Sequence, residues 1–382
     1  MKKIHWLLSF GMVLAPQVLF ASTSYKIYID AGSTGSRIHL FQSDTAANTV
    51  PVITDLFNES VSPSLSSFAL SPQNAGDSLK PLLDDVSNQL QQRGITTVVP
   101  VNVYATAGMR LLPVDQQSPI YADVTAFIKD NYSHLTPGDI KTISGKIEAL
   151  YDWLDVNYLA ENFQKHQATV GSLDLGGAST QLALETNDTT KPLDETSFSI
   201  NGQAYRVFSI SFLGLGQDQA RGTIGNDLSA PSCYPQSYPM NGTEQGAYAF
   251  NNCHVNYESV LTKQDVSNQL ISLADAKFIA FSGFYYTYKF FKPSLVADRT
   301  NYDAAINSVC AQSWEQLQQS YPAESAAYLS TYCANGAYVD DLLYDTYHLN
   351  DSQLSISTKV NGKSIDWTLG AALYATINLK SQ

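Results

Sequence analysis

At residues 25–42 the sequence reads YKIYIDAGSTGSRIHLFQ. An apolar run ends in Asp30, a loop of small residues follows, and a second alternating apolar run completes the stretch. The same order recurs around Asp174 at residues 170–185, which read VGSLDLGGASTQLALE. The two Asp residues lie 144 positions apart, a domain-sized period far longer than the repeats of solenoid proteins. The repeat predicts two related lobes, each with a strand–turn–strand hairpin.

Both loops have the composition of an anion-binding turn. Glycine permits φ > 0 and exposes backbone N–H groups, and consecutive N–H groups form an anion-binding nest. One loop alone is also compatible with an ordinary hairpin turn, but two matched copies favour two lobes that hold a phosphate chain between them. Because Asp30 and Asp174 would repel phosphates, we expect them to hold a hydrated divalent metal. Hydroxyl donors to phosphate are expected from Ser33, Thr34, Ser36, Ser179 and Thr180.

A helix is predicted within residues 143–159, ISGKIEALYDWLDVNYL, because apolar residues recur at helical spacing after Gly145. Glu148 lies in the first turn, where the helix dipole favours its ionised form. An ionised carboxylate beside phosphates is what a general base for water requires. We expect Asp152 and Asp155 to form a solvated acidic face of this helix.

Two further segments carry candidate residues. Residues 98–105, VVPVNVYA, predict a strand, and Thr106 at its end could hydrogen-bond a metal-bound water, since open α/β sheets bind ligands at strand ends. Arg110 is compatible with a structural ion pair as well as with a site. Tyr286 and Tyr328 are either core residues, like most aromatic residues around them, or rings that stack on a base.

Composition narrows the class of protein. The chain has 382 residues, of which 44% are hydrophobic and 15% charged, as expected for a globular protein with more than one lobe. Its formal net charge of −13 argues against nucleic acid binding, which needs basic patches. Residues 1–21 predict a secretory signal peptide. We therefore expect an exported protein, periplasmic or secreted, that has no membrane span after processing and is a monomer.

The cysteines fit that compartment. All four lie in the second half of the chain, and an even number in an exported protein predicts two disulfides. Three pairings are possible, and the pairing of sequence neighbours is favoured because it closes short loops. Free buried thiols are the alternative; zinc is disfavoured because no Cys-x-x-Cys spacing occurs. The favoured pairs join Cys233 to Cys253 and Cys310 to Cys333.

Taken in order, five segments resemble the conserved blocks of the ecto-nucleoside triphosphate diphosphohydrolases, or apyrases. They span nearly the whole chain after the predicted signal peptide and read DAGSTGSR, YATAGMRLL, SGKIEALYDWLDVNY, LDLGGASTQ and DWTLGAA. The resemblance implies an α/β fold with two RNase H-like lobes, as in the actin, hexokinase and heat-shock chaperone ATPase superfamily, and an active site in the interlobe cleft. The lobes are expected at residues 22–165, completed by residues 366–382, and at residues 166–365.

The resemblance also implies roles for individual residues. Glu148 would be the general base, with the attacking water positioned by Ser179 and Gln181. A divalent cation, Ca or Mg and with Mn as a further option, would be held through water by Asp30 and Asp174, with Thr106 and Trp367 nearby. A nucleotide base would stack on Tyr286 and Tyr328. The phosphates of a nucleoside tri- or diphosphate would lie against Ser33, Thr34, Gly35, Ser36, Gly176, Gly177, Ala178, Ser179 and Thr180.

Three other functions remain open from the sequence. An exopolyphosphatase-like enzyme has similar loops but no need of a base clamp. A sugar kinase of the same fold would need an acceptor. A catalytically silent nucleotide-binding protein would keep the loops without turnover. Phosphate release from polyphosphate beside ATP separates the first from a nucleotide hydrolase. A kinase should release little phosphate without an acceptor, and ATP binding in calorimetry with no phosphate release would indicate the silent protein.

Overall fold

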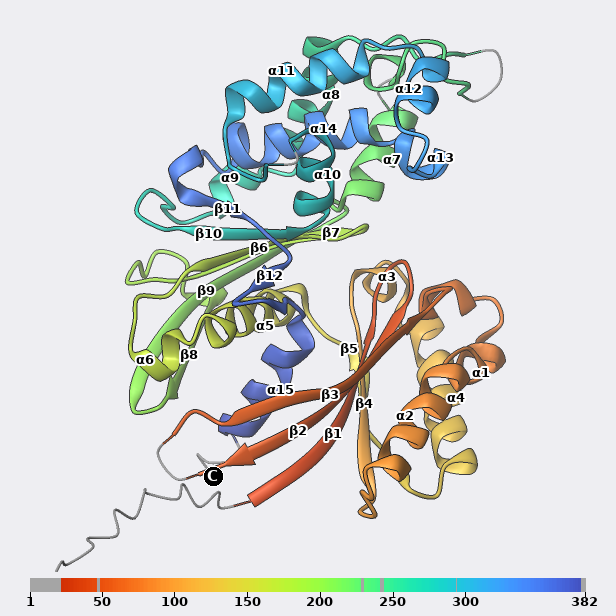
Figure 1. The fold of residues 1–382 in the computed structure, drawn as a ribbon, viewed down its shortest axis with the longest axis vertical. Helices are drawn as coiled ribbons and strands as arrows, with labels where there is room; N and C mark the ends of the chain where they lie inside the picture. The colour runs from red at the N-terminus through yellow and green to blue at the C-terminus, as the bar shows by residue number, and fades with distance from the viewer. Residues whose placement is uncertain (1–21, 47–48, 228–229, 241–243, 293, 379–382) are drawn as a thin grey trace, which may run out of the picture.

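The computed structural model describes residues 22–46, 49–227, 230–240, 244–292 and 294–378. The predicted signal peptide at residues 1–21 and the last four residues lie outside the described part. The described chain forms two lobes, each built on its own β-sheet, with two helices between them (Figure 1). The two mixed α/β lobes agree with the expected fold class.

The first lobe contains a five-stranded sheet in the order β3-β2-β1-β4-β5. Strand β1 is antiparallel to β2 and parallel to β4, so the first hairpin lies at the centre of the sheet. Its alternating apolar residues, such as Ile27 and Ile29, are fully buried. The strands are β1 (Ser22–Ala31), β2 (Ser36–Thr45), β3 (Val52–Val61), β4 (Val99–Ala105) and β5 (Leu135–Thr142).

Helices cover the outer face of this sheet (Figure 1). Their apolar side chains, among them Leu83 and Val124, pack with the strand residues into one core. The helical segments are η1 (Leu65–Phe68), η2 (Pro72–Asn74), α1 (Ala75–Ser78), α2 (Lys80–Gln92), α3 (Ala107–Arg110) and α4 (Val114–Asn131).

The second lobe contains a six-stranded sheet in the order β11-β10-β6-β7-β9-β8. Here the second hairpin is central: β6 is antiparallel to β7 and parallel to β10. The strands are β6 (Gly171–Leu175), β7 (Ser179–Glu185), β8 (Glu195–Ile200), β9 (Gln203–Leu213), β10 (Phe278–Ser282) and β11 (Leu354–Ile356); a separate pair is formed by β12 (Lys359–Val360) and β13 (Lys363–Ser364).

A helical layer lies on the outer face of the second sheet (Figure 1). Two disulfides join parts of this layer, Cys233 to Cys253 and Cys310 to Cys333, with Cα separations of 4.9 and 5.7 Å. This is the pairing of sequence neighbours that the sequence favours. The helices are α7 (Gln217–Asp227), α8 (Phe250–Lys263), α9 (Val266–Gln269), α10 (Gly283–Phe291), α11 (Arg299–Cys310), α12 (Trp314–Ser320), α13 (Ala326–Leu329) and α14 (Tyr332–Asp340), with short η3 (Pro192–Asp194), η4 (Pro231–Cys233) and η6 (Asp351–Gln353) and the π-helical η5 (Asp341–Thr346).

Two helices fill the space between the lobes, α5 (Gly145–Leu159) and α15 (Trp367–Asn378), with the short α6 (Asn162–Lys165) after α5. Helix α5 packs on β6, β7 and β9, whereas α15 packs on α5 and on β1–β3. One apolar cluster therefore includes residues of both sheets and both helices, such as Tyr28, Trp153, Tyr205 and Leu373. This core joins the two lobes.

Candidate active site

The two hairpins share one register. In β1–β2 (hairpin 1), Asp30 pairs with Arg37. In β6–β7 (hairpin 2), Asp174 pairs with Gln181. Each Asp is thus the penultimate residue of its strand and pairs with the residue seven positions later. The two hairpins agree with the strand–turn–strand repeat that the sequence predicts. The equivalent positions carry different chemistry in the two lobes, a guanidinium in one and an amide in the other.

The turns of the hairpins approach each other closely. We call residues 32–35 loop 1 and residues 176–178 loop 2. A Cβ added to Gly177 would lie 3.0 Å from the hydroxyl oxygen of Ser33 and 2.7 Å from an oxygen of Asp218. The loop glycines do not have the positive φ that their composition suggests; the glycines with positive φ in the described chain are Gly94, Gly202, Gly214 and Gly362. Small size, rather than left-handed backbone, is what Gly177 supplies.

A third segment supports loop 2 from behind. The amide N–H groups of Gln217, Asp218 and Gly214 donate to the carbonyls of Gly176, Gly177 and Ala178, each at 2.9 Å. A Cβ on Gly216 would lie 2.3 Å from the amide nitrogen of Ala178, so only glycine fits there. The segment SFLGLGQ at residues 211–217, together with Asp218, therefore holds loop 2 in place.

Exposure differs among the residues expected to bind phosphate. Thr34 is exposed, Ser33 and the loop glycines Gly35, Gly176 and Gly177 are half-buried, and Ser36, Ala178 and Ser179 are buried. The hydroxyl of Ser36 has no hydrogen-bond partner although it is buried. The hydroxyl of Thr180 is fully buried and donates to the carbonyl of Asp174 at 2.7 Å. That hydroxyl is therefore not free to donate to a phosphate.

Glu148 lies in the first turn of α5, as predicted. The helix begins after Ser144, whose hydroxyl accepts from the amide of Ile147 at 3.3 Å. The Glu148 carboxylate is buried and accepts from Nη2 of Arg110 at 2.7 Å and from Nε2 of Gln181 at 3.3 Å. Burial raises the pKa of Glu148, while Arg110 opposes that rise.

Hydrogen bonds join Glu148, Ser179 and Gln181, the three residues for which the family resemblance implies a role at the attacking water. Gln181 donates to the hydroxyl of Ser179 at 2.6 Å and to that of Ser211 at 2.9 Å. Arg110 also donates to Ser179, at 3.0 Å, and to the carbonyl of Ile143. Arg110 thus forms an ion pair inside this network rather than elsewhere. Ser211 is the first residue of the segment SFLGLGQ, but it was not singled out from the sequence.

The acidic residues of α5 are not on a solvated face. Asp152 is 1% exposed and Asp155 is 0% exposed, so the expectation that both are solvated is wrong. Helix α5 lies between the lobes, and its residues from Glu148 to Leu159 are buried on all sides. One oxygen of Asp155 accepts from the amide of Asp366 at 2.7 Å. Both oxygens of Asp152 are buried and have no partner.

The carboxyl groups of Asp30, Glu148, Asp152 and Asp174 form one electrostatic cluster. Burial raises the pKa of Asp30 and Asp152 well above the usual value and that of Asp174 to about 7, and Glu148 adds to each rise. Among the residues that the structure describes, one oxygen of Asp30, one of Asp174 and both of Asp152 have no hydrogen-bond partner. Buried carboxylate oxygens without partners are the ligand type that hard divalent cations prefer. The residues present therefore fit a divalent metal or its water shell.

Asp366 anchors hairpin 1 to the start of α15. Its Oδ2 accepts from Nη1 of Arg37 and lies 3.1 Å from Nε2 of His39, whose Nδ1 lies 2.9 Å from Asp55. Despite burial, His39 and Arg37 hold the pKa of Asp366 far below its usual value. Burial opposes the charged form of His39, but Asp366 and Asp55 raise its pKa to about 10. The network joins segments 329 residues apart.

Thr106 and Trp367, the remaining residues expected near the metal, are both buried. Thr106 is buried, and its amide donates to the carbonyl of Ala31 at the end of β1. Trp367 is stacked between the rings of Tyr104 and Tyr151, with centroids 6.5 and 6.3 Å away.

The two tyrosines considered for base stacking are both exposed. Tyr286 is 61% and Tyr328 is 68% exposed. Neither is therefore a core residue, which was the alternative from the sequence. Tyr286 lies within electrostatic reach of Arg37 of hairpin 1.

The sequence matches the model of the GDA1/CD39 (nucleoside phosphatase) family over residues 17–233 and 240–382. The ectonucleoside triphosphate diphosphohydrolase 2 of Gallus gallus is 27% identical, over 94% of this chain and 84% of its own length. The Golgi apyrase of Schizosaccharomyces pombe is 28% identical, over 93% of this chain and 75% of its own length.

Solved structures share the fold at low sequence identity. The nucleoside triphosphate hydrolases of Neospora caninum superimpose with a TM-score of 0.66 at 14% identity, covering 94% of this chain and 93% of theirs. A Ppx/GppA family protein of Aquifex aeolicus gives a TM-score of 0.57 at 12% identity, covering 94% of this chain and 99% of its own. Both likenesses concern the two-lobed architecture.

Proposed function

The chain belongs to the GDA1/CD39 (nucleoside phosphatase) family, and from that membership and the cleft geometry we propose that it hydrolyses the terminal phosphoanhydride bond of nucleoside triphosphates. Its relatives named as triphosphate diphosphohydrolases and apyrases support this activity, and nucleoside diphosphates are the second expected substrate. The observation that carries the proposal is the buried network of Glu148, Ser179 and Gln181 beside the two facing loops.

Glu148 is proposed as the general base. It is the carboxylate within hydrogen-bond reach of both Gln181 and Arg110, and its burial raises its pKa and so its strength as a base. Gln181 and Ser179 are hydrogen-bonded to each other and would hold the attacking water in line with the terminal phosphorus. Glu148 would take the proton of that water as the oxygen attacks, and the shortened nucleotide would leave with its terminal oxygen.

The two loops are proposed to bind the phosphate chain from both sides. Phosphoryl transfer depends chiefly on positioning and on neutralisation of charge. The half-buried Ser33, Gly35, Gly176 and Gly177 lie where loop 1 and loop 2 approach, and the unpartnered hydroxyl of Ser36 adds a donor. Arg110 contributes positive charge beside Glu148 and Ser179.

A divalent cation is proposed to accompany the phosphates. When bound, it would neutralise part of the phosphate charge. Asp30 and Asp174 would hold it through water, and their unpartnered oxygens support that role. Asp152 has two such oxygens and joins this set, while Thr106 and Trp367 would line the same end of the cleft.

The nucleotide base is proposed to stack on Tyr286 and Tyr328. Their high exposure supports this role, because two large rings left open to solvent on one lobe have faces available to a ligand. Export to an oxidising compartment is also proposed, since both cysteine pairs are disulfide-bonded. No described helix is long and apolar enough to cross a membrane.

A time course of ATP, ADP and AMP, separated by chromatography, tests the proposed activity. We expect phosphate release that requires Mg²⁺ or Ca²⁺ and stops with EDTA. Accumulation of ADP would identify a triphosphatase, and direct passage to AMP an apyrase. Polyphosphate is the control substrate: faster phosphate release from polyphosphate than from ATP, or no release from ATP over hours, would contradict the proposal.

A further inference from the structure

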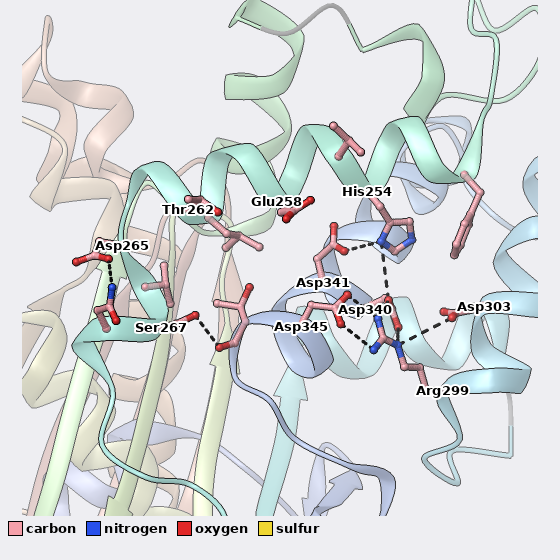
Figure 2. A pocket seen from close by; sticks show the side chains of 16 residues that line it. His254, Glu258, Thr262, Asp265, Ser267, Arg299, Asp303, Asp340, Asp341 and Asp345 are labelled. Atoms are coloured by element: carbon pink, nitrogen blue, oxygen red, sulfur yellow. Dashed lines mark hydrogen bonds and ion pairs between the residues drawn. The ribbon is translucent and has the colours of Figure 1, made fainter.

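A second cluster of ligating side chains lies in the helical layer of the second lobe, away from the two hairpins (Figure 1). It surrounds a cavity of about 520 Å³ between α8, α11 and η5. Figure 2 shows His254 of α8 directed toward Asp341 and Asp340, with Arg299 of α11 beside them. None of these residues takes part in the proposed hydrolysis.

Three residues of this cavity have the geometry of metal ligands. Nδ1 of His254 lies 2.5 Å from Oδ1 of Asp341 and 3.9 Å from Oδ2 of Asp340. One ligand atom from each of the three lies within 4.8 Å of the others. Ligands of one tetrahedral zinc ion are about 3.4 Å apart, given bond lengths of about 2.0–2.2 Å. The His254–Asp341 pair would open by about 1 Å, and the Asp340 oxygen would move in by about half that distance.

Unpartnered buried atoms provide a second, independent observation. Asp341 is 4% exposed and lines the cavity, and its Oδ2 has no hydrogen-bond partner within the described part of the chain. Nε2 of His254 and Oδ1 of Asp303 also lack partners. A buried carboxylate oxygen without a partner costs free energy unless a proton or a cation compensates it.

The charge of the cavity favours a cation. Six acidic residues line it, against Arg299 and His254 as the basic ones. Arg299 donates to both oxygens of Asp340 and both of Asp345, so it compensates part of this charge. It also fixes the orientation of the Asp340 carboxylate, as residues behind metal ligands commonly do. The acidic lining residues are Glu258, Asp265, Asp303, Asp340, Asp341 and Asp345.

We propose that His254, Asp340 and Asp341 form a second metal site, which binds a divalent transition-metal ion of the Zn²⁺ class and is separate from the cation that accompanies nucleotide. Imidazole with carboxylates suits Zn²⁺, whereas the all-carboxylate cleft suits Mg²⁺ or Ca²⁺. The bound ion would join the second turn of α8, where His254 follows Cys253 of the Cys233–Cys253 disulfide, to the start of η5. Such π-helical turns frequently occur at functional positions.

Zinc binding to the full-length protein tests this site. Isothermal titration with ZnCl₂ is performed in excess Mg²⁺, which occupies the carboxylate cleft. We expect one equivalent of Zn²⁺ per chain and a rise in Tm on saturation. His254→Ala and Asp341→Asn should each weaken zinc affinity by at least about 100-fold, because each removes a direct ligand. His134→Ala is the matched control, since His134 is an exposed histidine outside the cluster.

Two readouts keep the test decisive. Asp341→Asn preserves the shape of the side chain, so it reports on binding even if His254→Ala fails to fold. Anomalous diffraction at the zinc edge from soaked wild-type crystals needs no variant, and we expect a peak bonded to His254. Hydrolysis of ATP with Mg²⁺ should be unchanged in both variants. Zinc stoichiometry and affinity unchanged in both variants, or an anomalous peak only in the cleft, would overturn the proposal.

Discussion

Hairpin 1 and hairpin 2 have the same register and the same terminal Asp, yet they are held in place by different chemistry. Arg37 and His39 of hairpin 1 are ion-paired to Asp366, with Asp55 on the far side of His39. Gln181 of hairpin 2 is held by neutral donors and acceptors, Ser179 and Ser211, and reaches the carboxylate of Glu148. One backbone pattern thus carries a charged anchor in the first lobe and, in the second, a neutral amide that we propose positions the attacking water.

The largest expected effect on hydrolysis comes from substitution of Glu148, whose carboxylate accepts a hydrogen bond from Gln181 of hairpin 2. We expect Glu148→Gln to lower kcat for ATP by roughly 10³-fold, since a positioned base contributes about 10²–10⁴-fold. The Kd for ATP should change little, because the loops and the cation hold the phosphates. Steady-state kinetics and calorimetry measure the two quantities. A variant that retains wild-type kcat would exclude Glu148 as the base.

Substitutions at the two register-matched positions separate the roles of the hairpins. Gln181→Ala should lower kcat by about 10²-fold, comparable to loss of one preorganised donor. Arg37→Ala should leave kcat within about threefold, because its side chain is 51% exposed and an exposed ion pair contributes only about 0–1 kcal/mol. Equal losses of kcat in the two variants would contradict the different roles assigned to Gln181 and Arg37.

Substitutions of Asp30 and Asp174 test whether the two hairpins share one role, that of holding the metal. If both hold one metal, Asp30→Asn and Asp174→Asn should each raise the Mg²⁺ concentration for half-maximal activity by about 10–100-fold. The measurement is ATP hydrolysis at graded Mg²⁺. Asp77→Asn, an exposed carboxylate in α1, is the control. A shift in only one of the two variants would assign the metal to one lobe.

We expect the contacts to the nucleotide base to come from the second lobe alone, which also carries Gln181. Tyr286→Ala and Tyr328→Ala should each raise KM for ATP by about tenfold, since stacking of a base on an aromatic ring contributes about 1–3 kcal/mol. Inorganic tripolyphosphate has no base, and its KM should not change. If KM rose equally for both substrates, the rings would act on the phosphates or on the fold instead.

The smallest expected effect is a dependence of folding stability on pH, which arises from His39 of hairpin 1. The pKa of His39 is about 10 in the folded protein, above its unfolded value of about 6.5. The stabilisation that protonated His39 gives to the folded protein is therefore complete below pH about 6.5 and is lost as the pH rises through 10. We expect Tm to fall over that interval by several degrees, and His39→Gln to remove this part of the slope. An unchanged slope in the variant would show that another group titrates.

The hairpins, the strand before Thr106 and the helix that carries Glu148 were predictable because their signals are local. Alternation of apolar residues, a strand-ending Asp and helical spacing all act over a few residues. The disulfides followed from short loop closure. The same local reasoning failed for Asp152 and Asp155, because polarity on one face of a helix says nothing about what packs on that face.

The paired glycine loops, separated by one domain length, were enough to predict the two lobes, and they led us to propose phosphate binding between them. The block around Glu148 was enough to nominate a base. The partners of that base depended on tertiary structure. Arg110 and Gln181 lie 38 and 33 residues from Glu148 in the chain, and Asp366 meets hairpin 1 across more than 300 residues. Packing of α5 and α15 between the sheets determines these contacts and buries the carboxylates, since side-chain hydrogen bonds at such separations depend on which surfaces meet rather than on local sequence.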